Sequence, residues 1–143
     1  MKRDPRLQRL SSDHHAALVV ARALSRRAEE GTLDAALVAD LRGRFDRELD
    51  PHFRIEEEVL LPPLRAIGDA ELAARIASDH AALRAHLLAA EQGDHGRLAD
   101  FARLLVEHVR FEERTLFPRC EEAIPAALDA AALSLSADDR QRS

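Results

Sequence analysis

The sequence predicts an all-α protein: an antiparallel, up-down four-helix bundle followed by a short C-terminal helix. Apolar residues recur every three or four positions along several long stretches, which is the period of a helix with one buried face. The composition agrees, since 46% of the 143 residues are hydrophobic and the chain has 5 Gly and 6 Pro. The stretches are joined by a few residues each, so consecutive helices become antiparallel neighbours. The length suits one domain, residues 1–143, with the bundle at about 11–122.

The first helix is expected to begin after Ser11 or Ser12 and to stop at Gly31. A serine at the N-cap accepts a hydrogen bond from a first-turn amide, and glycine is the common residue just past a helix end. Thr32 or Asp34 opens the second helix for the same reason as the serines. The remaining helices are expected at 69–92, at 94 or 96 to 122 and at 125–135, with a frayed tail at 138–143.

Prolines shape the second helix. Pro62 and Pro63 are expected to end it at about Leu61, because a residue that precedes proline disfavours the α conformation. Pro51 lies inside the same helix and should kink it at about Asp50. A proline has no amide hydrogen to donate, and its ring crowds the preceding turn.

Charge and composition exclude several function classes. The formal net charge of −5 argues against a nucleic-acid or anionic-membrane surface, and an aromatic content of 3% argues against base stacking. The longest apolar run, 16–21, has six residues, whereas a membrane span needs about 20. Cys120 is the single cysteine, which excludes an internal disulfide framework. We therefore expect a soluble cytoplasmic protein with no nucleic-acid or membrane partner.

Histidines are unusually frequent for a chain of this length. Two of them interrupt apolar stripes: His80 continues the stripe of Ile76 and Leu83, and His108 continues that of Leu105. Each places an imidazole where an apolar residue belongs. The seven histidines are His14, His15, His52, His80, His86, His95 and His108.

The chain also repeats itself. The segment 52–62, HFRIEEEVLLP, matches 108–118, HVRFEERTLFP, with His, Arg, Glu, Glu, Leu and Pro in common. The segment His15-Ala-Ala-Leu18 likewise matches His80-Ala-Ala-Leu83. This order indicates two helical hairpins related by duplication and closed into one bundle.

The repeated segments each carry His-x-x-x-Glu, namely His52 with Glu56 and His108 with Glu112. On a helix, residues four apart share one face, about 5–6 Å apart at Cβ, so the imidazole and the carboxylate aim at one point. This ligand pair suits iron, manganese or zinc, and carboxylates can bridge two ions. A glutamate on an apolar stripe is costly unless it is paired or bound to metal. A metal site therefore explains the pattern better than surface ion pairs do.

These motifs resemble those of hemerythrin-like, or HHE cation-binding, domains over about residues 11–122. The resemblance implies a four-helix bundle with a non-heme diiron centre in its core. We expect two iron ions, with manganese or zinc as alternatives, and the two glutamates as bridges. The ligands that the resemblance implies are His52, Glu56, His80, His108, Glu112 and one histidine of the first helix.

Two adjacent residues compete for the first-helix position. His15 is favoured by the His-Ala-Ala-Leu repeat and by the family's habit of an apolar residue three places on. His14 is favoured by its phase, since it continues the stripe of Leu10 and Ala17. Adjacent helical residues point about 100° apart, so one of the two is expected to bind. We favour His15 on the strength of the repeat.

One departure from the family pattern affects the function. Oxygen-carrying hemerythrins have His-x-x-x-His on the third helix, whereas His80 is followed at that spacing by Arg84. An arginine stays protonated and cannot ligate a metal. The open position is then available to water, to an exogenous ligand, or to Glu57 or Glu113 as additional ligands. This disfavours reversible oxygen carriage and favours redox, peroxide or nitric-oxide chemistry.

We therefore expect a dimetal protein that binds, senses or reacts with oxygen, peroxide or nitric oxide, or that takes part in iron handling. A binding role is favoured over an enzymatic one. The alternatives are a metalloenzyme with peroxidase- or catalase-like activity at the same centre, and a helical interaction module whose site is empty or holds zinc. His86 and His95 are expected outside the site, and Cys120 as a packed thiol.

Overall fold

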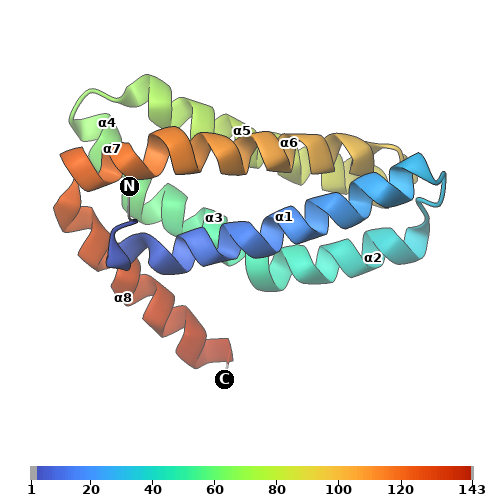
Figure 1. Ribbon diagram of the computed structural model, residues 1–143, viewed down its shortest axis with the longest axis horizontal. Coiled ribbons are helices and arrows are strands. Elements are labelled where there is room, and N and C mark those ends of the chain that lie inside the picture. Colours follow the sequence, from blue (N-terminus) through green and yellow to red (C-terminus); the bar gives the residue numbers. More distant parts are fainter. Residues whose placement is uncertain (1–2, 143) are drawn as a thin grey trace.

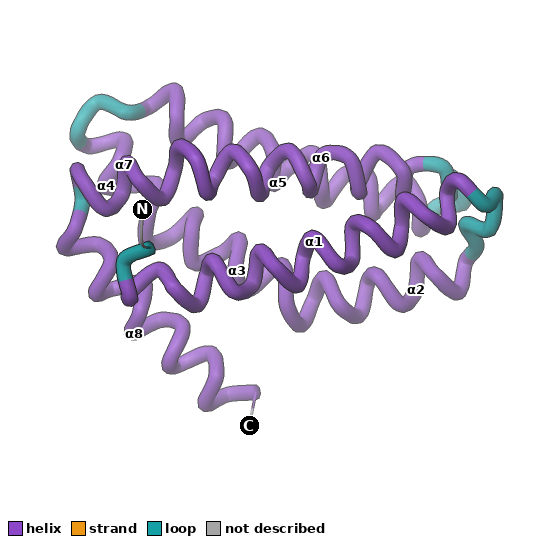
Figure 2. The backbone as a smooth tube through the Cα atoms, in the orientation of Figure 1, coloured by secondary structure: helices purple, strands orange, loops and turns teal. Residues whose placement is uncertain are grey.

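The computed structural model describes residues 3–142, and within that range its regular structure is entirely helical (Figure 1). The prediction of an all-α protein is confirmed. Four long helical stretches lie side by side, and a fifth crosses one end of them (Figure 2). In Figure 1, α1 (Gln8–Glu29) runs away from the N-terminus and the second stretch returns toward it. The next two stretches, which contain α5 (Ala70–Glu91) and α6 (Arg97–Phe111), run out and return in the same way, and α8 (Pro125–Arg142) then points away from them.

The first stretch begins earlier than expected, before Ser11 and Ser12. The reason is Asp4, whose carboxylate accepts a hydrogen bond from the amide of Arg6, while a proline takes the next position, where no amide hydrogen is needed. The stretch stops before Gly31, as predicted, and that glycine has a positive φ of 69°. It consists of the 3-10 turn η1 (Pro5–Leu7) and of α1 (Gln8–Glu29).

The second stretch is longer than predicted. Asp34 caps it by accepting a hydrogen bond from the amide of Leu37. Pro62 and Pro63 do not end it, which corrects the expected end at Leu61. They lie in the first turn of the next helical segment, where a missing amide hydrogen is tolerated. The segments are α2 (Ala35–Arg44), η2 (Phe45–Leu49), α3 (Asp50–Ile55), η3 (Glu56–Leu60) and α4 (Leu61–Ala66).

The remaining stretches begin where predicted, and the last one ends later. Asp69 and Gly96 occupy N-cap positions, and Pro125 lies in the first turn of the final helix. The expected frayed tail is corrected over 138–142, because the final helix continues to Arg142, and residue 143 lies outside the described residues. The elements are α5 (Ala70–Glu91), α6 (Arg97–Phe111), η4 (Glu112–Leu116), α7 (Phe117–Ala123) and α8 (Pro125–Arg142).

The elements η2, η3 and η4 are π-helical turns, and each begins six residues before a proline. The amide just before that proline donates to the carbonyl five residues back instead of four. A proline cannot donate, and its ring crowds the carbonyl four residues back, so a widened turn accommodates it without ending the helix. The disturbance expected near Asp50 takes this form. The three turns pair Phe45 with Pro51, Glu56 with Pro62 and Glu112 with Pro118.

Buried side chains form two hydrophobic clusters with a polar layer between them. The loop-end cluster lies toward the 30–34 and 92–96 connections and includes Leu24, Leu41 and Phe101. The α8-end cluster includes Leu10 and Phe117 and is covered by α8, which packs against η1 and η3. The polar layer consists of His14, His52, Glu56, Asp79, His80, His108 and Glu112, all buried.

The packing of α8 yields a stability prediction. Leu128 is fully buried in the α8-end cluster, whereas Leu133 on the same helix is 73% exposed. Leu128→Ala should therefore lower the free energy of unfolding by about 2–5 kcal/mol. The matched control Leu133→Ala should change it by less than about 0.5 kcal/mol. Urea unfolding of the chelator-treated protein measures both, and equal effects would contradict this docking of α8.

Candidate metal centre

Six buried side chains from every long stretch converge in the middle of the polar layer. His14 comes from α1 and His80 from α5, and each continues the apolar stripe of its helix. The repeated segments supply the rest: His52 and His108 from α3 and α6, and Glu56 and Glu112 from the first positions of η3 and η4. Both glutamates have no exposed surface, and the four histidines are at most 4% exposed.

The six side chains form two groups that share both glutamates. Within each group one nitrogen or oxygen atom per residue lies within 4.8 Å of the others. Metal–nitrogen and metal–oxygen bonds of about 2.0–2.2 Å keep the ligands of one ion within about 4.4 Å of one another. The spacing within each group is therefore compatible with a bound cation. The groups are His14, His52, Glu56 and Glu112, and Glu56, His80, His108 and Glu112.

The second group has polar atoms without hydrogen bonds. Nε2 of His80 lies 3.0 Å from Oε1 of Glu56, and Nε2 of His108 lies 3.0 Å from Oε2 of Glu112. Their angles do not allow hydrogen bonds, and among the described residues these four buried atoms have no other hydrogen-bond partner. Buried polar atoms in proteins are almost always satisfied. Four such atoms that face one another form an arrangement that a bound cation would satisfy.

In the first group, the Nε2 atoms of the histidines form hydrogen bonds with the carboxylate oxygens of the glutamates. Nε2 of His14 lies 2.7 Å from Oε1 of Glu112, and Nε2 of His52 lies 3.2 Å from Oε2 of Glu56. Nε2 of His52 is also 3.8 Å from Oε1 of Glu112. Both glutamates thus face histidines of both groups, which is the position of a bridging carboxylate.

The electrostatics of the layer favour positive charge. Burial disfavours a charged imidazole, but the carboxylates of Glu112 and Asp79 outweigh burial and raise the pKa of His108 to about 10. The pKa of His52 is likewise raised well above its usual value, chiefly by Glu56 against the effect of burial. Burial works against the charge of Glu112, yet His108 holds the pKa of that carboxyl well below its usual range. The same carboxylates would attract a metal cation.

Each of the four histidines also contacts an outer carboxylate through Nδ1. An ionised carboxylate only accepts hydrogen bonds, so Nδ1 carries the hydrogen. In the neutral imidazole Nε2 then presents its lone pair to the interior, which is the orientation that a metal ligand needs. The pairs are His14 with Glu113 at 2.7 Å, His52 with Asp13 at 3.1 Å, His80 with Glu57 at 2.6 Å and His108 with Asp79 at 3.0 Å.

Arginines hold these outer carboxylates in turn. The pKa values of all four carboxyls are lowered, because the histidine and arginine contacts outweigh burial. Arg84 illustrates the arrangement, since its guanidinium donates to Glu57 at 3.0 Å and to Asp50 at 3.0 Å. The other contacts are Arg3 to Glu113 at 3.5 Å, Arg9 to Asp13 at 3.3 Å and Arg75 to Asp79 at 3.3 Å.

The structure places three predicted site residues differently from expectation. The preference for His15 is corrected: His15 is exposed and lies outside both groups, whereas His14 points into the layer. The apolar stripe of Leu10 and Ala17 correctly predicted that His14 faces the interior. His15 is rotated from it by about 100° around the helix axis. Glu57 and Glu113 are partly buried and lie on the Nδ1 side of His80 and His14, outside the two groups.

The residues expected outside the site are also outside the two groups. His86 accepts a hydrogen bond from Arg97, and His95 lies in a turn. Cys120 is fully buried in the α8-end cluster, and burial raises the pKa of its thiol to about 12, as expected of a packed cysteine.

Sequence reasoning missed Asp13 and Asp79, although a repeat marks them. The segment 9–14, RLSSDH, matches 75–80, RIASDH, with Arg, Ser, Asp and His in common. This register aligns His14 with His80, and the structure gives the two histidines equivalent positions, one in each group. The His-Ala-Ala-Leu match was shifted from it by one residue and therefore selected the wrong histidine for the buried position.

A small cavity lies beside the first group, with free space of about 10 Å³, close to the minimum that holds one water molecule. His14, His52 and His108 form one side of it, and apolar residues of the loop-end cluster, including Phe53 and Leu105, form the other. A molecule that binds there would touch histidines of both groups.

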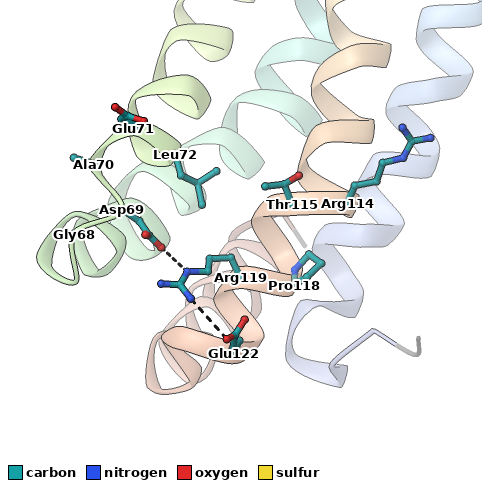
Figure 3. Close-up of a pocket in the computed structure, with 10 residues that line it drawn as sticks. All are labelled: Gly68, Asp69, Ala70, Glu71, Leu72, Arg114, Thr115, Pro118, Arg119 and Glu122. Atoms are coloured by element: carbon teal, nitrogen blue, oxygen red, sulfur yellow. Dashed lines mark hydrogen bonds and ion pairs between the residues drawn. The ribbon is translucent and has the colours of Figure 1, made fainter.

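A larger depression of about 660 Å³ lies between the start of α5 and the η4–α7 region (Figure 3). It contains none of the six buried ligand candidates. Two arginines line it, Arg114 and Arg119, and Arg119 is paired with Asp69 at 2.6 Å and lies 3.8 Å from Glu122 (Figure 3). The residues grouped as a candidate metal site lie in the polar layer, away from this depression.

The fold and the polar layer define a helical protein with a buried carboxylate–imidazole site for cations. The family model described as hemerythrin HHE cation binding domain matches residues 6–120, so the chain belongs to the hemerythrin family. Searches of curated proteins and of solved structures found no match. In the described part of the chain, every helix is too short or too polar to cross a membrane.

The outer carboxylates yield a prediction about metal affinity. Asp79→Ala removes the acceptor that orients His108, and loss of such a contact typically weakens metal binding about 10–100-fold. The control Asp100→Ala removes a more exposed aspartate whose contacts are with Arg97 and Arg103. Competition titrations against a chromophoric chelator compare the variants with the unmodified protein. Equal affinities for the Asp79 variant and the control would contradict the orienting role.

Proposed function

We propose that the protein holds two iron ions in the core of an antiparallel four-helix bundle. The observation that carries this proposal is the set of four buried atoms, two from glutamates and two from histidines, that face one another without hydrogen bonds. Membership of a cation-binding family supports it independently. His14 and His52 would hold one ion, His80 and His108 the other, and Glu56 and Glu112 would bridge them. Mixed imidazole and carboxylate donors suit iron, with manganese and zinc as alternatives.

Two features support a small molecule as the further ligand. Each ion would have two histidines and two shared carboxylates, which leaves coordination positions open, and Arg84 is engaged with Glu57 and Asp50. The cavity beside His14, His52 and His108 leaves space of about the size of one water molecule next to the candidate ligands. Bound iron would supply redox chemistry and a binding position for that molecule.

The proposed activity is therefore to bind, sense or react with oxygen, peroxide or nitric oxide. We favour the role of a binding protein; the cavity next to the ions is too small for an organic substrate, which leaves the small molecules named above as its ligands. The chain's own residues exclude bulk water, orient the imidazoles and hold the pKa of the Glu112 carboxyl well below its usual range.

Metal analysis with an absorption spectrum tests this proposal. The purified protein, loaded with ferrous iron under nitrogen and then exposed to air, should contain two iron ions per chain. It should absorb in the near ultraviolet, where zinc is silent. His14→Ala should lose metal, and thermal stability should fall with it, because a ligand that binds the native state stabilises it. The adjacent variant His15→Ala is the matched control and should retain both.

Each result that would contradict the proposal points to a different alternative. Less than one ion per chain with every divalent metal tried would overturn the dimetal centre. Full zinc occupancy with no iron uptake would favour an interaction module over a redox site. Sustained turnover of peroxide by the iron-loaded protein would favour a metalloenzyme.

A further inference from the structure

A second hollow opens at the surface next to the buried cavity. It has a volume of about 200 Å³ and lies between α1 and the π-helical turn η2. Arg9 and Glu48 stand at its polar side, and Ala16 is exposed at its rim. Its floor is made by Ala17 and Leu49, which are 3% and 6% exposed. We call this hollow the outer pocket and the small buried space the inner cavity.

The two spaces share part of their walls. Asp13, Ala17 and Leu49 line both the outer pocket and the inner cavity, so they form the partition between them. On the inner side the partition faces His14 and His52. Two larger surface depressions among the described residues, at α5–α7 and between α1 and α6, share no residue with the inner cavity.

We propose that the outer pocket is the access route by which a small uncharged molecule reaches the inner cavity, with Leu49 and Ala17 as the constriction. The proposal rests on the proposed function, since the inner cavity is where that molecule would meet the ions. The outer pocket brings the molecule to within one layer of side chains of the histidines.

The residues of the partition determine the size and polarity of the molecules that can pass from the outer pocket to the inner cavity. Ala17 presents a methyl group, and Leu49 is a flexible apolar side chain at the end of a π-helical turn. Asp13 is fixed by its contacts with His52 and Arg9. Passage through the partition therefore requires a movement at Ala17 or Leu49. Because the constriction is apolar and its third residue is the carboxylate Asp13, an anion would lose its hydration and meet a like charge on the way in. A diatomic gas meets no such penalty.

Stopped-flow mixing of nitric oxide with the reduced, iron-loaded protein tests the route. Ala16→Phe covers the rim without altering a buried position and should slow association about tenfold, which is a barrier higher by about 1.4 kcal/mol. Leu49→Val shortens the constriction and should speed association about threefold. Metal content and the absorption spectrum of the resting protein should be unchanged in both variants, because neither residue belongs to the two groups.

The matched control is Ala28→Phe, which makes the same change on the same helix at the α1–α6 depression. It should leave the rate unchanged. Rates that are equal in all four proteins would overturn the access route while leaving the centre intact. An unmodified, iron-loaded protein whose spectrum does not respond to nitric oxide would instead contradict the proposed function, and the route with it.

Discussion

The burial of two carboxylates in an apolar interior is the constraint on which the rest of the structure depends. Glu56 and Glu112 have no exposed surface and lie between two hydrophobic clusters. The desolvation penalty of a buried ion is several kcal/mol even after relaxation, so such a pair needs compensating positive charge. The compensation is layered. Four imidazoles surround the glutamates, four outer carboxylates orient the imidazoles, and arginines at the surface hold the outer carboxylates. The cation that we propose between the glutamates would complete the innermost layer.

The backbone is adapted to the same two residues. The π-helical turns η3 and η4 begin at Glu56 and Glu112, and each is followed by a proline at the same spacing. A π-helical turn inserts one residue into a helix and is frequent at functional sites. The proline makes an ordinary α-helical turn unfavourable there. The repeated motif therefore encodes the ligand and the local backbone together, which explains why Pro62 and Pro118 do not end their helices.

The sequence predicted the helices and the two His-x-x-x-Glu pairs well, because apolar periodicity and an i,i+4 pair are local signals. It predicted helix boundaries less well, since Asp4 and the π-helical turns shifted them. The choice of His15 over His14 failed because a short repeat was aligned one residue out of register. The roles of Glu57 and Glu113 depend on which helix faces which, so their contacts with His80 and His14 could not be derived from spacing alone.

Anomalous X-ray diffraction at the iron edge, from crystals of the iron-loaded protein, tests the central claim most directly. Two buried carboxylates shared by two pairs of histidines predict two iron peaks in the polar layer. One should lie among His14, His52 and the glutamates, and the other among His80, His108 and the same glutamates. A single peak, or iron bound only at surface carboxylates with the buried layer still hydrogen-bonded to itself, would contradict the account.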